Sequence, residues 1–253
     1  MLHLMKTEWK KVRLPVIAAI ILILTAACIL SCTLYREYAI QHDLEAWEIG
    51  TEFFSFIFPL FVVLPLCWNM FYERKNNFML YVLPRVSEKR YLTAKWLVYA
   101  ISAFFILFLP YMVSAIAAVY VNPPLSEVNT SPFEHVFTDS FTNTPLLYAF
   151  LLSCWKGVIG ILIMSLGFVI SMHVKNIFVV LTGPFIYAVL ENFILAVLRL
   201  EQYRLVTAFE PSTISANAVS ILSFLVGPVL LILFTLFTVI YFKFIKKTAV
   251  VSV

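Results

Sequence analysis

The sequence predicts an all-α integral membrane protein with six transmembrane helices. Hydrophobic residues make up 62% of the chain, charged residues only 13%, and the mean hydropathy is +0.94, whereas a soluble domain carries roughly 25% charged residues. Apolar runs near or above ~18 residues recur along the chain, and each can cross a hydrocarbon layer of ~30 Å as a helix. The expected spans are 14–34, 53–71, 96–121, 146–171, 177–198 and 221–242, within a single transmembrane domain 1–253.

The arm before the first span predicts an amphipathic helix at the membrane interface. Apolar side chains recur along it at helical spacing, at Leu2, Met5, Trp9 and Val12. Basic side chains fall beside this stripe, at Lys6, Lys10 and Arg13. Such a helix lies in the inner interface with Trp9 at headgroup depth and its cations towards anionic lipid. The alternative, a plain basic leader, would need the charges but not the stripe.

The first span itself is expected to be retained rather than cleaved as a signal peptide. Its apolar stretch continues beyond Cys28 and exceeds the core of ~7 to 15 residues that a signal peptide has. Thr25 stands three residues before Cys28, where a lipoprotein signal would have Leu. The cysteines all fall inside spans, at Cys28, Cys32, Cys67 and Cys154. Thiols there usually behave as small apolar groups, so we expect neither a disulfide nor a metal site.

The distribution of Lys and Arg predicts the orientation, because cytoplasmic loops keep the positive charge. Fourteen of the eighteen basic residues fall in the N-terminal arm, the segment 72–95, the turn at Lys175 and the C-terminal tail. Only Arg36, Arg199 and Arg204 fall on the other side. Both termini and the segment 72–95 are therefore expected to be cytoplasmic, and the loops 122–145 and 199–220 extracellular.

The segment 72–95 predicts a short helical excursion between the second and third spans. Its first part can extend the second span as a helix, Pro84 stops that helix, and Ser87 is a plausible N-cap for the next. A solvated positive loop would require charge, but not a proline, a cap or the apolar run 78–83. We expect a docking surface for another protein.

This segment carries its residues in a pattern: Glu73, Asn76-Asn77-Phe78, Leu83-Pro84, Ser87, Tyr91-Leu92 and Ala94-Lys95. The pattern resembles the cytoplasmic loop of the type-two ABC exporter permeases. It is closest to the short six-span permeases of lantibiotic immunity and peptide-toxin export. In that family the loop forms a coupling helix that inserts into a cleft of the ATPase subunit, and an amphipathic interface helix precedes the first span.

The resemblance implies a set of ATPase-coupling residues. Apolar side chains around Pro84 would enter the cleft, notably Leu80, Tyr81, Val82 and Leu83. Charged side chains would ring that contact, namely Glu73, Arg85, Glu88, Lys89 and Arg90. Met5, Trp9, Lys10 and Arg13 would belong to the interface helix. None of the six glycines belongs to a phosphate-cradling loop with Lys-Ser/Thr, so the chain itself would bind no cofactor.

Two charged residues inside the spans predict a buried pair. Lys156 and Glu191 lie at similar depths in the fourth and fifth spans, and a charge near the bilayer centre costs ~2.5 to 3.5 kcal/mol. We expect them to pair across neighbouring helices, either to fix helix packing or to act in substrate passage. Prolines at 59, 65, 110, 184 and 228 are expected to kink or break their spans. The connection 199–220 is expected to dip back as short helices.

The leading functional interpretation is the permease subunit of an ATP-driven exporter in a bacterial plasma membrane. Two permease subunits, identical or similar, would enclose a pathway, and two separate ATPase subunits would supply ATP and Mg. By resemblance the cargo is an amphipathic or antimicrobial peptide, in toxin secretion or in bacteriocin immunity. Export of drugs or lipids is an alternative, as is a secondary transporter that uses Lys156 and Glu191 as a relay. An intramembrane enzyme is disfavoured, because no His/Glu constellation converges in a span.

Overall fold

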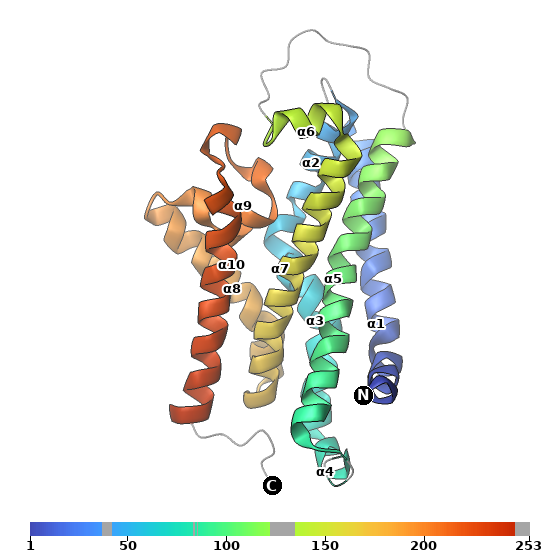
Figure 1. The fold of residues 1–253 in the computed structure, drawn as a ribbon, viewed down its shortest axis with the longest axis vertical. Helices are drawn as coiled ribbons and strands as arrows, with labels where there is room; N and C mark the ends of the chain where they lie inside the picture. The colour runs from blue at the N-terminus through green and yellow to red at the C-terminus, as the bar shows by residue number, and fades with distance from the viewer. Residues whose placement is uncertain (37–41, 83, 85, 122–134, 246–253) are drawn as a thin grey trace.

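The computed structural model describes residues 1–36, 42–82, 84, 86–121 and 135–245, and all regular structure in these residues is helical. Within these described ranges, six helices are long and apolar enough to cross a membrane (Figure 1). They are α1 (Leu2–Ile29, continued by the π-helical turn Leu30–Leu34), α3 (Phe54–Lys75), α5 (Glu88–Tyr120), α7 (Pro145–His173), α8 (Ile177–Val197) and α10 (Ile221–Ile240). Each predicted span coincides with one of these helices to within a few residues at its ends, apart from the first, whose helix begins in the arm, and the third, whose helix begins eight residues earlier, at Glu88. The prediction of a six-helix membrane protein is confirmed at this level.

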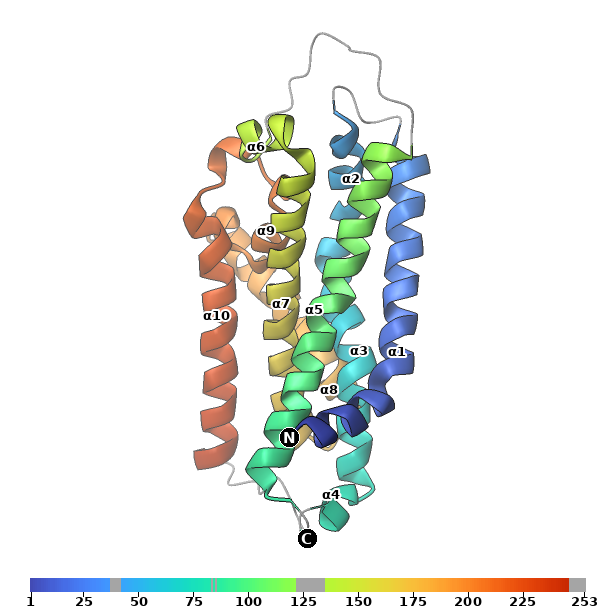
Figure 2. The same cartoon turned by 45° about the vertical axis from the view of Figure 1, so that its right-hand side comes forward.

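Successive long helices alternate in direction, so that their termini gather at two ends of the bundle (Figures 1 and 2). Four shorter helices lie between them: α2 (Asp43–Glu52), α4 (Phe78–Val82), α6 (Thr138–Asn143) and α9 (Leu205–Phe209). We call the end that holds the start of α1, α4 and the end of α10 the basic end, since it carries Lys10, Lys75 and Lys243. The opposite end, which holds α2 and α6 with Glu45 and Glu48, is the acidic end.

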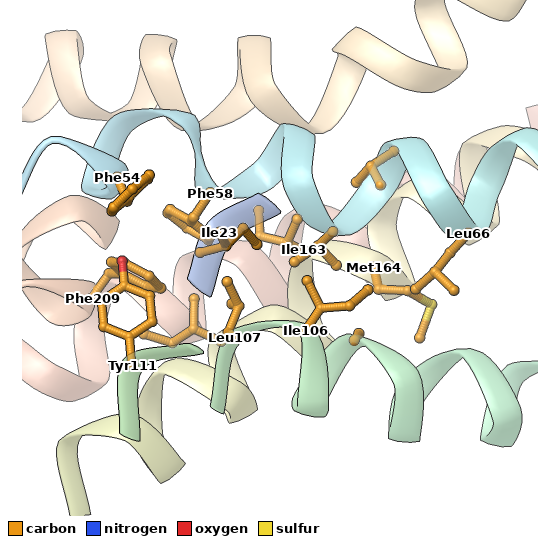
Figure 3. Close-up of a cluster of buried hydrophobic side chains, with 14 of the residues drawn as sticks. Ile23, Phe54, Phe58, Leu66, Ile106, Leu107, Tyr111, Ile163, Met164 and Phe209 are labelled. Atoms are coloured by element: carbon orange, nitrogen blue, oxygen red, sulfur yellow. The ribbon is translucent and has the colours of Figure 1, made fainter. Parts of the chain in front are cut away.

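Helices α5 and α7 pack together at the centre of the bundle, because small residues let them approach closely. A Cβ atom added at Gly160 would lie only 3.1 Å from the carbonyl oxygen of Ala103 on α5. The buried side chains around this contact are apolar and interlock between α3, α5 and α7 (Figure 3). Within lipid, such van der Waals packing rather than exclusion of water holds helices together.

Helices α8 and α10 flank this core and bury little of their surface. The buried residues of α8 are Val180, Leu181, Pro184, Ala188 and Glu191. Those of α10 are Ser223, Gly227, Pro228 and Leu231. Most other side chains of both helices are partly or fully exposed and apolar. These faces match a hydrocarbon surrounding rather than water.

The prolines inside the spans do not interrupt them. Helix α3 continues through Pro59 and Pro65, α5 through Pro110, and α8 and α10 through the prolines that follow Gly183 and Gly227. The expectation that some would break a span was therefore wrong. In α10, Gly227 allows the helix to approach the backbone of Leu205 closely, because a Cβ atom at Gly227 would lie 2.7 Å from the Cα atom of Leu205.

The connection from α8 to α10 folds back into the bundle as short helices, as the sequence suggested. All five residues of α9 are buried, and 3₁₀ turns flank it. Phe209, the last residue of α9, stacks on Phe58 of α3 with ring centroids 4.1 Å apart (Figure 3). This connection thus supplies part of the core.

The N-terminal part of α1 is bent away from the axis of the remainder (Figure 2). Pro15 is the only proline inside α1, and we attribute the bend to it, because a proline removes a helical hydrogen bond. The face turned to the protein carries Glu8 and Val12, both buried. Trp9, Lys10 and Arg13 lie on the exposed side, and Met5 is half-buried. Contact of that exposed side with membrane lipid stays a prediction.

Candidate functional site

Helix α4 forms the tip of the basic end (Figures 1 and 2). Helix α3 ends at Lys75, and the chain reverses through Asn77, whose φ of 54° is in the left-handed region that asparagine tolerates. Helix α4 follows, and the chain then passes Pro84, which does not lie in a helix. Ser87 occupies the N-cap position of α5, as predicted, but its hydroxyl makes no capping hydrogen bond.

Two aromatic side chains of α4 are exposed at this tip. Tyr81 is 75% exposed and Phe78 is 38% exposed. Val82, one helical turn after Phe78, packs against the core. A five-residue helix has little intrinsic stability, so its position depends on the side chains beneath it.

The predicted coupling residues divide into three groups. Pro84, Glu88, Lys89 and Arg90 are exposed beside α4. Leu83 and Arg85 lie outside the described residues, as does the side chain of Leu80. Glu73 differs from the prediction, because its side chain is only 10% exposed and faces the protein rather than the surroundings. It pairs with lysines inside the protein instead of ringing an outer contact.

Glu73 is the centre of a buried charge network between α1, α3 and α5. Its Oε1 atom accepts a hydrogen bond from Lys11 Nζ at 2.8 Å, and its Oε2 atom accepts one from the Tyr91 hydroxyl at 2.8 Å. Lys95 Nζ donates to the same Oε2 atom, and the Lys95 side chain is fully buried. Glu8 completes the network, 2.5 Å from Lys11 Nζ and 3.3 Å from Lys95 Nζ.

The network joins two glutamates to two lysines and is therefore electrically balanced. Aromatic rings shield it: Lys95 Nζ lies 5.6 Å from the ring centroids of both Tyr91 and Tyr99. Lys11 Nζ also lies 4.7 Å from the ring centroid of Phe78 in α4. The exposed helix is thus in direct contact with the buried charges.

Sequence reasoning missed Glu8, Lys11 and Lys95 as members of this network. A signal was present for Glu8, because it lies three residues after Met5 and four before Val12, on the apolar stripe of the arm. An acidic residue on an apolar face requires a buried cation. No spacing rule indicates that this cation comes from a residue 87 positions later in the chain, since Lys95 meets Glu8 only after folding.

A second buried charge pair lies nearer the acidic end. Lys156 Nζ, on α7, lies 2.5 Å from Glu210 Oε2, which directly follows α9, and neither side chain has exposed surface. Thr51 of α2 donates to the same oxygen at 3.4 Å. Ser212 donates to the other carboxylate oxygen, also at 3.4 Å.

Aromatic rings enclose this ammonium group. Its Nζ atom lies 4.0 Å from the ring centroid of Tyr111, 5.0 Å from that of Trp47 and 5.3 Å from that of Phe209. Trp47 is fixed in turn, because its indole N–H donates to the Tyr111 carbonyl and to Ser114. A carboxylate and several ring faces together replace the water that a buried ammonium loses.

The predicted pair between Lys156 and Glu191 is wrong. Both carboxylate oxygens of Glu191 instead accept a hydrogen bond from the backbone N–H of Leu205, at 3.0 and 3.1 Å. The depth argument failed because it treated the connection after α8 as external. That connection enters the bundle and brings Glu210 to Lys156. The alternative of a secondary transporter relied on Lys156 and Glu191 as a relay, and these two side chains do not pair with each other.

At the acidic end a histidine bridges two carboxylates of α2. His135 Nε2 lies 3.2 Å from Glu45 Oε1, and its Nδ1 lies 3.2 Å from Glu48 Oε2. The ring stacks on Phe141 of α6 at 3.9 Å, and the Tyr148 hydroxyl donates to Glu48 at 2.9 Å. Burial alone would lower the pKa of His135, but the two carboxylates outweigh this effect and raise the pKa from 6.5 to about 9.

Comparisons of this chain with protein-family models, with curated proteins and with solved structures gave no match.

Proposed function

We propose that this chain is the membrane-spanning permease subunit of an ATP-driven exporter of the type-two ABC kind, with α4 as the surface on which a separate ATPase subunit docks. The observation that carries this proposal is the pairing of an exposed aromatic helix with a buried charge network directly beneath it. A loop that served topology alone would need neither feature.

The surface of α4 has the composition of a protein interface. Phe78 and Tyr81 supply exposed aromatic anchors, and Glu88, Lys89 and Arg90 supply exposed charges beside them. Interfaces are commonly held by a few such anchors inside a polar rim. The resemblance of the segment 73–95 to the family's coupling loop supports the same assignment.

The network beneath α4 would transmit movement of the docked subunit. Lys11 contacts the Phe78 ring of α4 and pairs with Glu73 of α3, while Lys95 ties Glu73 to α5. A displacement of α4 therefore acts on α1, α3 and α5 together. Such a rigid connection suits a subunit in which ATP hydrolysis by a partner changes the positions of the transmembrane helices relative to one another.

The remaining parts of the proposal follow from charge and resemblance. The basic end faces the cytoplasm, since Lys and Arg concentrate there. The exporter comprises two permease subunits and two ATPase subunits in a bacterial plasma membrane, with ATP and Mg bound by the ATPases. The cargo is an amphipathic or antimicrobial peptide, moved for toxin secretion or for immunity.

Co-purification tests the docking surface. The chain, in its unaltered form and as Tyr81→Asp, is expressed in its own host, and the proteins that co-purify are searched for an ATPase subunit. Tyr120→Asp is the matched control, because Tyr120 is 68% exposed at the end of α5, away from α4. At equal membrane expression we expect Tyr81→Asp to lose the ATPase and Tyr120→Asp to retain it. Retention by both variants, or no ATPase on the unaltered chain, contradicts the proposal.

A further inference from the structure

An apolar groove runs between α8 and α10, the two helices that bury little of their surface. It encloses about 820 Å³, within the range of ~300 to 1,000 Å³ that is usual for ligand sites. Leu190 and Ile194 line it from α8, and Leu233 and Phe237 line it from α10. These four side chains are 53 to 62% exposed, so the groove opens towards the hydrocarbon that surrounds the bundle.

One carboxylate, that of Glu191, lines this apolar groove. The long helices described by the structure bury three glutamates, of which Glu8 and Glu73 are paired with lysines. Among the described residues, only the N–H of Leu205 bonds to Glu191, and no basic side chain lies within 4 Å of its carboxylate. The Arg204 guanidinium, which lies 3.7 Å from Glu201, acts on the Glu191 carboxylate electrostatically without forming an ion pair with it. A carboxylate at membrane depth is costly unless a cation pairs with it directly.

An aromatic ring lies beside this carboxylate. Tyr187 precedes Glu191 by one helical turn, and both line the groove. The Tyr187 ring meets Phe234 of α10 with centroids 4.6 Å apart, so aromatic surface extends across the groove. A carboxylate next to ring faces is the arrangement that holds the ammonium of Lys156 elsewhere in this chain. The groove thus combines apolar walls, an acidic residue and aromatic rings, which are the elements of an ammonium site.

We propose that the groove between α8 and α10 binds an alkylammonium amphiphile from the lipid phase. The hydrocarbon chain lies along the apolar walls, and the ammonium pairs with Glu191 beside Tyr187. An alcohol of equal chain length lacks the charge, and an anionic amphiphile would place two negative charges together. This site concerns the chain alone, so it does not depend on an ATPase or on the cargo of the proposed exporter.

Equilibrium binding of radiolabelled dodecylamine to the purified chain tests this site, in nanodiscs of phosphatidylcholine with dodecanol as the uncharged comparison. Glu191→Gln keeps an acceptor for the N–H of Leu205 but removes the charge. We expect it to weaken dodecylamine binding by about tenfold to hundredfold, as for a lost hydrogen bond to a charged group, and to leave dodecanol binding unchanged. Glu88→Gln is the matched control, because Glu88 is exposed and does not line the groove.

A second variant locates the bound molecule. Gly183 lines the groove, and a Cβ atom there would meet only the end of the Ile170 side chain, at 3.2 Å. Gly183→Leu should narrow the groove and weaken the binding of both probes at unchanged thermal stability. Equal amine binding by Glu191→Gln and the unaltered chain overturns the proposal. Full binding of both probes by Gly183→Leu also overturns it. The proposal fails as well if the unaltered chain binds no dodecylamine because a second copy of the chain covers the groove.

Discussion

Lys156 Nζ on α7 lies 2.5 Å from Glu210 Oε2, and neither side chain has any exposed surface. Glu210 directly follows α9, so this single ion pair fastens the connection between α8 and α10 to the centre of the bundle. Because each charge is removed from water, each depends on the other.

Removal of one partner should therefore cost more than removal of both. We expect Glu210→Gln to lower the free energy of unfolding by about 3 to 5 kcal/mol, because it leaves the Lys156 ammonium buried without a carboxylate. The double variant Lys156→Met, Glu210→Gln should recover a large part of this loss. Thermal unfolding of the purified variants in one detergent measures the cycle, and additive effects of the two changes would exclude coupling. Glu191→Gln, whose carboxylate pairs with no lysine, should change stability much less.

Glu73 should control how firmly α4 is held. Glu73→Gln leaves Lys11 and Lys95 with only Glu8 as an anionic partner, at a cost of about 1 to 3 kcal/mol for poorly satisfied buried groups. We expect faster hydrogen exchange of the amides of α4 and of the adjoining turns of α1 and α5. The exposed Glu88→Gln serves as control and should leave exchange unchanged. Normal protection of α4 in Glu73→Gln would mean that other contacts hold the helix.

His135 should make the acidic end pH-dependent. Its pKa is about 9 in the folded chain and about 6.5 in an unfolded one, so its contribution to stability is fully present below pH ~6.5. That contribution is lost as the pH rises through about 9, where the proton shared with Glu45 and Glu48 leaves. We expect the melting temperature to fall over this interval in the unaltered chain and to fall less in His135→Gln. His3→Gln, at the start of α1 and at the basic end, should behave like the unaltered chain. Identical dependence of the melting temperature on pH in all three proteins would refute the bridge between His135 and the two glutamates.

The proposed orientation predicts which sites react from outside the cell. Ser87→Cys stands beside α4 at the basic end, and Ser140→Cys stands in α6 at the acidic end, both at exposed positions. A membrane-impermeant maleimide added to intact cells should label Ser140→Cys and not Ser87→Cys, with the unaltered chain as background. The reverse pattern would invert the topology and place α4 outside the cytoplasm.

The sequence predicted the long helices well because span length and hydropathy are local properties. It also predicted the start of α5 after Ser87, since capping residues act over a few positions. The expected helical extension of the second span up to Val82 was wrong, because α3 ends at Lys75 and the chain reverses at Asn77 before α4. Pro59 and Pro110 were expected to kink or break their spans, and they do not break them, because surrounding helices tolerate a proline that a water-exposed helix would not.

The partners of buried charges could not be predicted in the same way. Lys156 was recognised as costly, but its partner Glu210 belongs to a connection that folds inwards. Glu73 was expected in the charged rim of a docking contact, yet it pairs with Lys11 and Lys95 from two other helices. Such pairs depend on which helix faces meet, which is a property of the assembled bundle rather than of any short segment.

Photo-crosslinking from α4 tests the central claim most directly. A photoreactive amino acid replaces Tyr81 or, as control, Tyr120, and membranes that contain the assembled transporter are irradiated. The account predicts a crosslink between position 81 and the ATPase subunit, with none from position 120. The opposite result is an ATPase that co-purifies with the chain but forms no crosslink with position 81, whether or not it forms one with position 120. That result would contradict α4 as the docking helix.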